Sequence, residues 1–265
     1  MVRGLGAAAT VLSLLASGCH ALDRFEDGGA TVFVFATHHA TPENGSFSFR
    51  GDENQPRTFE SSDGWTVTLL EAYVTISAVT LIGCNGSEHE LRMFWGPCPE
   101  DLRDRDLATL TVAGNHVGEG EYCALEVEYA AYMPPIIDEE AEDTRHEVPT
   151  NPDVQGSTIY LRGGARLGDG DSTNFQLTSP ATITVDLDLS EIEDGSPLHI
   201  AHQEDFPKEL LVSKTYDRYF DGVDFNAFDE ASLEARLPQL LADETRVSLG
   251  TVVELPEDQT TTPPG

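Results

Sequence analysis

Histidines supply the residues of this chain that are best suited to hold a metal. They fall into two pairs: His38 with His39 just after one predicted strand, and His199 with His202 after another strand and a turn that contains Gly195 and Pro197. Imidazole nitrogens suit copper or zinc, so the four side chains together form a candidate metal site, with copper as a candidate cofactor. Neighbouring residues of a strand face opposite sides, so His38 and His39 can share a metal only where the chain leaves the sheet. The alternative is that each histidine is an ordinary surface or hydrogen-bonded residue.

Oxygen-bearing residues offer two weaker candidates for a cation site. The segment 168–174 places oxygen ligands at alternate positions, but its twelfth position is Pro180 and not a bidentate Glu, which excludes an EF-hand. A plain turn between two strands is favoured there. Asp217, Asp221 and Asp224 could surround a cation, although a capped turn explains them as well.

Sequence motifs of the common enzyme classes are missing from the chain. There is no Gly-x-Ser-x-Gly turn, no phosphate-binding loop and no Gly-rich dinucleotide fingerprint. The segment from His89 to Met93 approaches a zinc-protease motif, but Met stands where the second His is needed. We therefore assign no catalytic residue and favour a protein that is not an enzyme.

The first 18 residues predict a signal peptide. Arg3 precedes an apolar run at 5–15, which is about half of the roughly 20 residues that a membrane span needs. The following Ala-Ser-Gly-Cys at 16–19 resembles a bacterial lipobox, which implies a lipid on Cys19 and attachment to a membrane. Because position 20 is His and not Asp, we expect an outer-membrane lipoprotein, on its periplasmic or surface face. Cleavage after Ala21, which would release a soluble protein, is the alternative.

The mature chain is strongly acidic. With Arg3 removed, 14 basic residues face 47 acidic ones, a net charge of −33. Such a surface repels nucleic acid and anionic lipid, which excludes both as ordinary partners. Lysine is found only at 208 and 214, and this shortage together with the acidity is typical of proteins adapted to salt. Binding of cations is the second explanation of the acidity.

Three cysteines remain once Cys19 carries the lipid. In an oxidising compartment Cys84 and Cys98, which close a hairpin-sized loop, are the predicted disulfide. Cys123 then stays as a buried residue of a strand. A bond between Cys98 and Cys123 is the competing possibility.

The pattern of apolar residues predicts an all-β fold. Strands are expected over 31–35, 65–69, 73–82, 123–129, 181–190 and 245–253, most of them by two-residue alternation. A helix should begin near Asp229 or Ser232, and Pro238 should end or kink it. We predict an Ig-like antiparallel β-sandwich with one short C-terminal helix. The predicted order is signal peptide 1–18, lipid-anchored tether 19–29, one domain at 30–254 with an acidic loop at 134–156, and a disordered tail at 255–265.

Two stretches resemble a known group of proteins. Gly120-Glu-Tyr-Cys-Ala-Leu-Glu-Val-Glu-Tyr129 and Tyr73-Val-Thr-Ile-Ser-Ala-Val-Thr-Leu81 look like strands of the copper-binding MbnP-like lipoproteins. The resemblance covers about a third of the chain. It implies an exported β-sandwich that handles copper through histidine, but the chain lacks a matched histidine motif.

Together these features favour a membrane-anchored binding module of the cell envelope, with His38, His39, His199 and His202 as possible ligands of copper or another metal. The alternative is a structural or adhesive envelope protein that recognises a protein or a polysaccharide. In that case Trp95, Tyr132 and the loop at 134–156 would carry the contacts.

Overall fold

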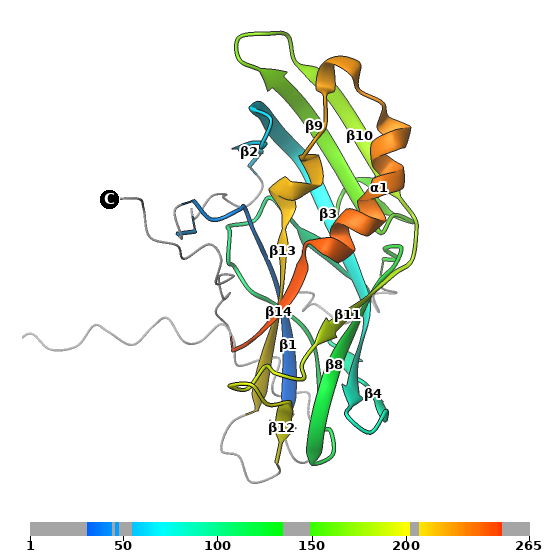
Figure 1. The fold of residues 1–265 in the computed structure, drawn as a ribbon. Helices are drawn as coiled ribbons and strands as arrows, with labels where there is room; N and C mark the ends of the chain where they lie inside the picture. Colours follow the sequence, from blue (N-terminus) through cyan, green and yellow to red (C-terminus); the bar gives the residue numbers. More distant parts are fainter. Residues whose placement is uncertain (1–30, 44–45, 48–54, 135–148, 202–206, 251–265) are drawn as a thin grey trace, which may run out of the picture.

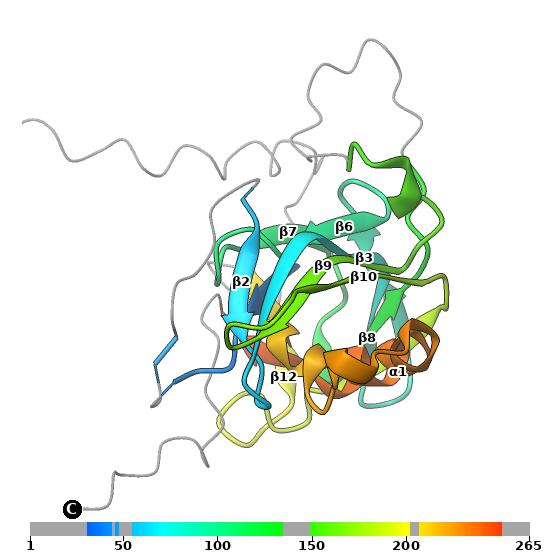
Figure 2. The ribbon, with the colours of Figure 1, turned by 90° about the horizontal axis from the view of Figure 1, so that it is seen from above.

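The computed structural model describes residues 31–43, 46–47, 55–134, 149–201 and 207–250, which form two sheets packed face to face (Figure 1, Figure 2). In the smaller sheet β1 lies between β13 and β7, and its pairing with β13 is parallel. The strand predicted at 31–35 is longer than expected, because β1 extends to His39. In sheet order the strands are β14 (Thr245–Leu249), β13 (Lys208–Thr215), β1 (Val32–His39), β7 (Leu110–Asn115) and β5 (Arg92–Met93).

The larger sheet is built around β3 (Trp65–Gly83), a single strand where the sequence predicted two. A shift of register between Leu69 and Glu71 marks the point where the alternation breaks, so two short patterns belong to one strand. Four strands flank it in the order β10 (Thr173–Ser179), β9 (Ile159–Leu167), β3, β8 (Gly120–Tyr129) and β11 (Ile183–Asp188). The short strands β2 (Arg57–Glu60), β4 (Glu88–Glu90) and β6 (Cys98–Asp101) pair with β3, and β12 (Leu198–Ile200) pairs with β8.

The core lies between the two sheets and follows the predicted alternation. On β11 the side chains of Ile183, Val185 and Leu187 are buried, while Thr184, Asp186 and Asp188 between them are exposed. Burying one face and leaving the other in water is what an antiparallel sandwich requires. The predicted β-sandwich is confirmed.

The α-helix of the described part of the chain, α1 (Glu230–Asp243), lies against β10 and β11 (Figure 1). Asp229 is its N-cap, as predicted, and Leu233, Leu237 and Leu241 are buried against the sheet. The helix does not end at Pro238, which lies inside it. Short 3-10 turns are η2 (Pro152–Val154), η3 (Tyr216–Phe220) and η4 (Phe225–Ala227), and within the described residues no helix is long and apolar enough to cross a membrane.

Helix α1 also covers an edge of the larger sheet. The backbone N–H of Gln176 donates to Glu230, and that of Thr178 donates to Glu234, so two alternate donors of β10 are occupied. Between β9 and β10 the segment 168–172 is a plain turn, as favoured from the sequence, with Gly168 at a φ of 54°.

The disulfide joins Cys84 to Cys123, with 4.8 Å between their Cα atoms, and Cys98 is a free, buried cysteine. The predicted bond between Cys84 and Cys98 is therefore wrong, as is its competitor between Cys98 and Cys123. The cause is strand pairing: β8 runs beside β3 and brings Tyr122 opposite Gly83, next to both bonded cysteines. Cys98 pairs instead with Ile76, in the middle of β3.

Several sequence predictions lie outside the described residues. These are the signal peptide 1–18, Cys19 and the tether 19–29, most of the acidic loop 134–156, His202 and the tail 255–265.

Candidate functional site

Charged side chains replace apolar ones at a single level of the core. On β1 the core-facing residues Val34 and Ala36 are followed by His38, and on β13 Val212 is followed by Lys214. Glu100 on β6 and Arg57 on β2 face the same space, together with Asp106 from the connection before β7. We call these five residues the ionic layer: His38, Arg57, Glu100, Asp106 and Lys214. Each of the five residues is at most 4% exposed.

Glu100 lies between the side chains of His38 and Lys214. Its Oε1 is 2.9 Å from Nδ1 of His38, and its Oε2 is 2.6 Å from Nζ of Lys214. Burial alone would raise the pKa of Glu100, but the Lys214 ammonium and the His38 hydrogen bond outweigh it and lower the pKa to about 2. Burial would lower the pKa of Lys214, whereas Glu100 raises it above its ordinary value. The carboxylate thus holds together strands from both sheets.

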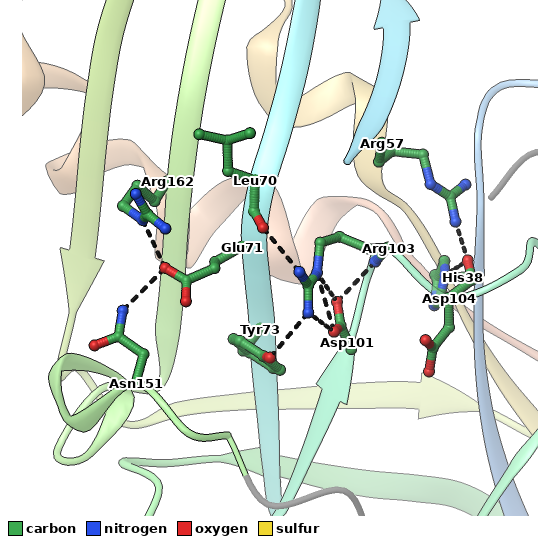
Figure 3. A network of polar contacts seen from close by, with 10 residues as sticks. All are labelled: His38, Arg57, Leu70, Glu71, Tyr73, Asp101, Arg103, Asp104, Asn151 and Arg162. Carbon is green, nitrogen blue, oxygen red and sulfur yellow. Dashed lines mark hydrogen bonds and ion pairs between the residues drawn. The ribbon is translucent and has the colours of Figure 1, made fainter. Parts of the chain in front are cut away.

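Arg57 joins the second half of the ionic layer. Its guanidinium donates to the carboxylate of Asp106, to the backbone carbonyl of Asp104 and, over 2.8 Å, to the hydroxyl of Tyr216. The same Asp104 carbonyl accepts from Nε2 of His38 at 3.0 Å, so it lies between the two side chains (Figure 3). Both ring nitrogens of His38 are therefore engaged, which leaves neither available to a metal.

His39 points to the other face of β1. Its Nδ1 lies 2.8 Å from the carbonyl of Ala40, and its ring packs edge-on against Phe47 with 4.9 Å between ring centroids. Burial lowers the pKa of His39, so the imidazole is neutral over most of the physiological range. His38 and His39 lie within one strand and face opposite sides, so the condition for sharing a metal is not met.

The structure does not bring the described histidines of the candidate metal site together. His199 is exposed on β12, which pairs with the first residues of β8. Strand β8 begins at Gly120, five residues after Asn115. Asn115 pairs with Val32, so β12 lies at the end of the molecule where β1 starts. His38 stands six residues farther along, about 20 Å at 3.3 Å per residue. Among the described residues no three His, Cys, Asp or Glu side chains form a metal-binding group.

A cleft of about 470 Å³ opens where β1, β2 and η3 meet, next to the ionic layer. We call it the β1 cleft. Among the described residues, its polar lining consists of four carboxylates, one guanidinium and five hydroxyl groups, with no histidine, cysteine or lysine. The lining residues are Ala40, Thr41, Pro42, Glu43, Thr58, Phe59, Glu60, Ser61, Ser62, Thr66, Asp217, Arg218 and Asp221. Of the three aspartates singled out in the sequence, Asp217 and Asp221 are here, whereas Asp224 caps the turn η4.

Hydrogen bonds hold the walls of the β1 cleft in place. Asp217 accepts from the backbone N–H of Thr41 at 2.9 Å and from its hydroxyl at 3.2 Å. The hydroxyl of Ser62 donates to Asp221 over 2.7 Å, and Arg218 pairs with the same carboxylate at 3.0 Å. Burial raises the pKa of Asp217 although Thr41 opposes the shift. The walls are therefore positioned before any ligand arrives.

A separate polar network lies on the face of the larger sheet that is turned away from the core (Figure 3). Arg103 pairs with Asp101 and donates to the Leu70 carbonyl at 2.8 Å and to the Tyr73 hydroxyl at 3.1 Å. Glu71 accepts from Arg162 at 2.6 Å and from Asn151 at 2.9 Å. These bonds fasten loops to the sheet, and we assign them a structural role.

Sequence reasoning found two of the cleft carboxylates but missed the ionic layer. A signal was present, because Lys214 continues the alternate apolar positions Leu210 and Val212 of β13 and a charge at such a position needs a buried partner. The partner itself is 114 residues away, and nothing in the sequence points to Glu100.

Comparisons with known proteins place the chain only loosely. No family model matches it, and no curated protein does. Among solved structures it is similar to MbnP from Methylosinus trichosporium, with a TM-score of 0.39 and 9% sequence identity over 82% of this chain and 98% of that one. The resemblance expected from the sequence is thus matched by a weak structural likeness, which at this TM-score supports no inference about copper.

Proposed function

We propose that this chain is an exported, membrane-anchored binding module that captures a positively charged ligand in the β1 cleft. The observation that carries the proposal is the polar lining of that cleft, where four carboxylates face one guanidinium. Arg218 is paired with Asp221, so the remaining carboxylates give the cleft a negative charge. Oxygen ligands suit hard cations such as Ca²⁺ and also ammonium groups.

Calorimetric titration with Ca²⁺, Zn²⁺, Cu²⁺ and a diamine tests this function. Glu60→Gln, which removes one exposed carboxylate of the cleft, is expected to weaken binding about tenfold, the effect of losing roughly 1.4 kcal/mol. Glu126→Gln removes an equal charge from β8, outside the cleft lining, and is the matched control. Equal binding by both variants, or no binding by the wild type, would contradict the proposal.

Copper bound through histidine is a second candidate, which one observation favours. The lowered pKa of His39 keeps its imidazole in the neutral form that metals require. His39 directly precedes Ala40 at the wall of the β1 cleft. A copper site here would use the His39 imidazole as its histidine ligand. His39→Ala would then abolish copper binding and leave the Ca²⁺ titration unchanged, whereas Glu60→Gln would do the reverse.

Attachment through a lipid on Cys19 is part of the proposal. The bond between Cys84 and Cys123 supports export, because disulfides persist mainly in oxidising compartments. Mass spectrometry of the N-terminal peptide from cell envelopes tests the anchor. A lipid-modified Cys19 is expected, and an unmodified N-terminus at Leu22 would show a released protein instead.

Should the anchored protein bind none of the four probes, the structural or adhesive role would be preferred.

A further inference from the structure

The contact between Lys214 and Glu100 is closer and more completely buried than an ordinary ion pair. Nζ lies 2.6 Å from Oε2, with 0% and 5% of the two side chains exposed. The approach is not aligned as a hydrogen bond, and neither atom has another hydrogen-bond partner within the described residues. A lysine ammonium carries three N–H donors, so this arrangement leaves strong donors and two charges inside the core.

We propose that Lys214 and Glu100 become joined by an amide bond between Nζ and Cδ. The bond would replace the ammonium and the carboxylate by one neutral amide with a single N–H donor. Burial that makes the ionic pair costly would thereby favour the covalent product. The folded chain holds the two groups in contact, and fixed proximity of this kind can replace a large part of a reaction barrier.

The reaction is a condensation that needs no oxidant or other reagent. The Lys214 ammonium gives up a proton, and its lone pair attacks Cδ of Glu100 to form the Nζ–Cδ bond. The Cδ–Oε1 bond then breaks, and Oε1 leaves as water with two protons that both come from the ammonium. His38 is placed to deliver a proton to the departing oxygen, because its Nδ1 lies 2.9 Å from Oε1.

His38 is held for this task by its second nitrogen. Nε2 donates to the Asp104 carbonyl at 3.0 Å, which fixes the ring so that Nδ1 faces Glu100. We assign His38 as the general acid of the condensation. Tyr129, whose ring centroid lies 6.0 Å from Nζ of Lys214, helps to close the site against water.

The bond would connect the two sheets. Lys214 belongs to β13 of the smaller sheet, and Glu100 belongs to β6 of the larger one. The disulfide between Cys84 and Cys123 lies within the larger sheet and cannot hold the two sheets together.

Peptide mapping tests the bond directly, because the chain has only two lysines. The purified full chain is denatured, reduced and digested with trypsin, which cleaves after a free lysine. We expect cleavage after Lys208 and none after Lys214, whose peptide should be joined to the peptide of Glu100 and be lighter than the two together by one water. Lys208 is the internal control: its Nζ lies 2.8 Å from Glu193, but both side chains are 21% exposed.

Three variants separate this bond from other changes at Lys214. Glu100→Gln should form the same bond with release of ammonia, so that its joined peptides match those of the wild type. Lys214→Met should yield none. His38→Gln should lower the joined fraction at a given time after folding by tenfold or more, and an unchanged fraction would overturn the role of His38. Complete cleavage after Lys214 in the wild type, with the Glu100 peptide recovered separately, would overturn the proposal whatever the variants do.

Discussion

The two ends of β13 carry the same ion pair in different surroundings. Lys208 at its start meets Glu193 at 2.8 Å with both side chains partly in water, and Lys214 near its end meets Glu100 at 2.6 Å inside the core. Near water the attraction is screened and either side chain can be solvated if the other is lost. In the core neither charge has that alternative. Distance is nearly equal in the two pairs, so burial decides what each pair contributes.

The largest loss of stability is expected when Lys214 loses its charge. Lys214→Met leaves Glu100 buried without its lysine partner and in contact with His38, and we expect a loss of about 3 to 5 kcal/mol in the free energy of unfolding. Urea denaturation followed by fluorescence measures this loss. A loss below 1 kcal/mol would show that the core accommodates the unpaired carboxylate, and the contrast between the two ends would disappear.

The loss of stability at low pH should distinguish protein in which Lys214 and Glu100 form an ion pair from protein in which an amide bond joins them. In newly folded protein the pKa of Glu100 is about 2, well below its ordinary value of 4.5. A depressed carboxyl pKa contributes stability that is present above pH 4.5 and is lost as the pH falls toward 2. The linked protein has no carboxyl at this position and should lack that loss. Urea unfolding at several pH values, on newly folded and on aged protein, compares the two.

The smallest effect is expected at the exposed end of the strand. Lys208→Met should change the free energy of unfolding by less than about 1 kcal/mol, and added salt should reduce the effect further. Urea denaturation at low and high ionic strength provides the measurement. A cost comparable to that of Lys214→Met would mean that solvent exposure does not set the difference.

Alternation within strands allowed much of the fold to be predicted from the sequence. Ile183, Val185 and Leu187 show it clearly, because one face of β11 is buried and the other lies in water. Strand β13 was missed because Leu210, Leu211 and Val212 are all buried in a parallel pairing, which removes the alternation.

Long-range pairing limited what could be predicted of the site and the disulfide. Cys84 and Cys98 are close in the sequence, but the bond follows the register of β3 with β8 and goes to Cys123. The ionic layer likewise gathers side chains from separate strands of two sheets. Asp217 and Asp221 were noticed because they are close together in one turn, which is local information.

The carboxylates that α1 places on β10 have a consequence for how copies of this protein behave beside one another. An open strand edge is a template on which a neighbouring chain can add its own strand. Glu230 and Glu234 already occupy the N–H groups of Gln176 and Thr178, and they bring negative charge to the same rim. A neighbouring chain would thus meet a blocked and negatively charged border there, which opposes the addition of its strand.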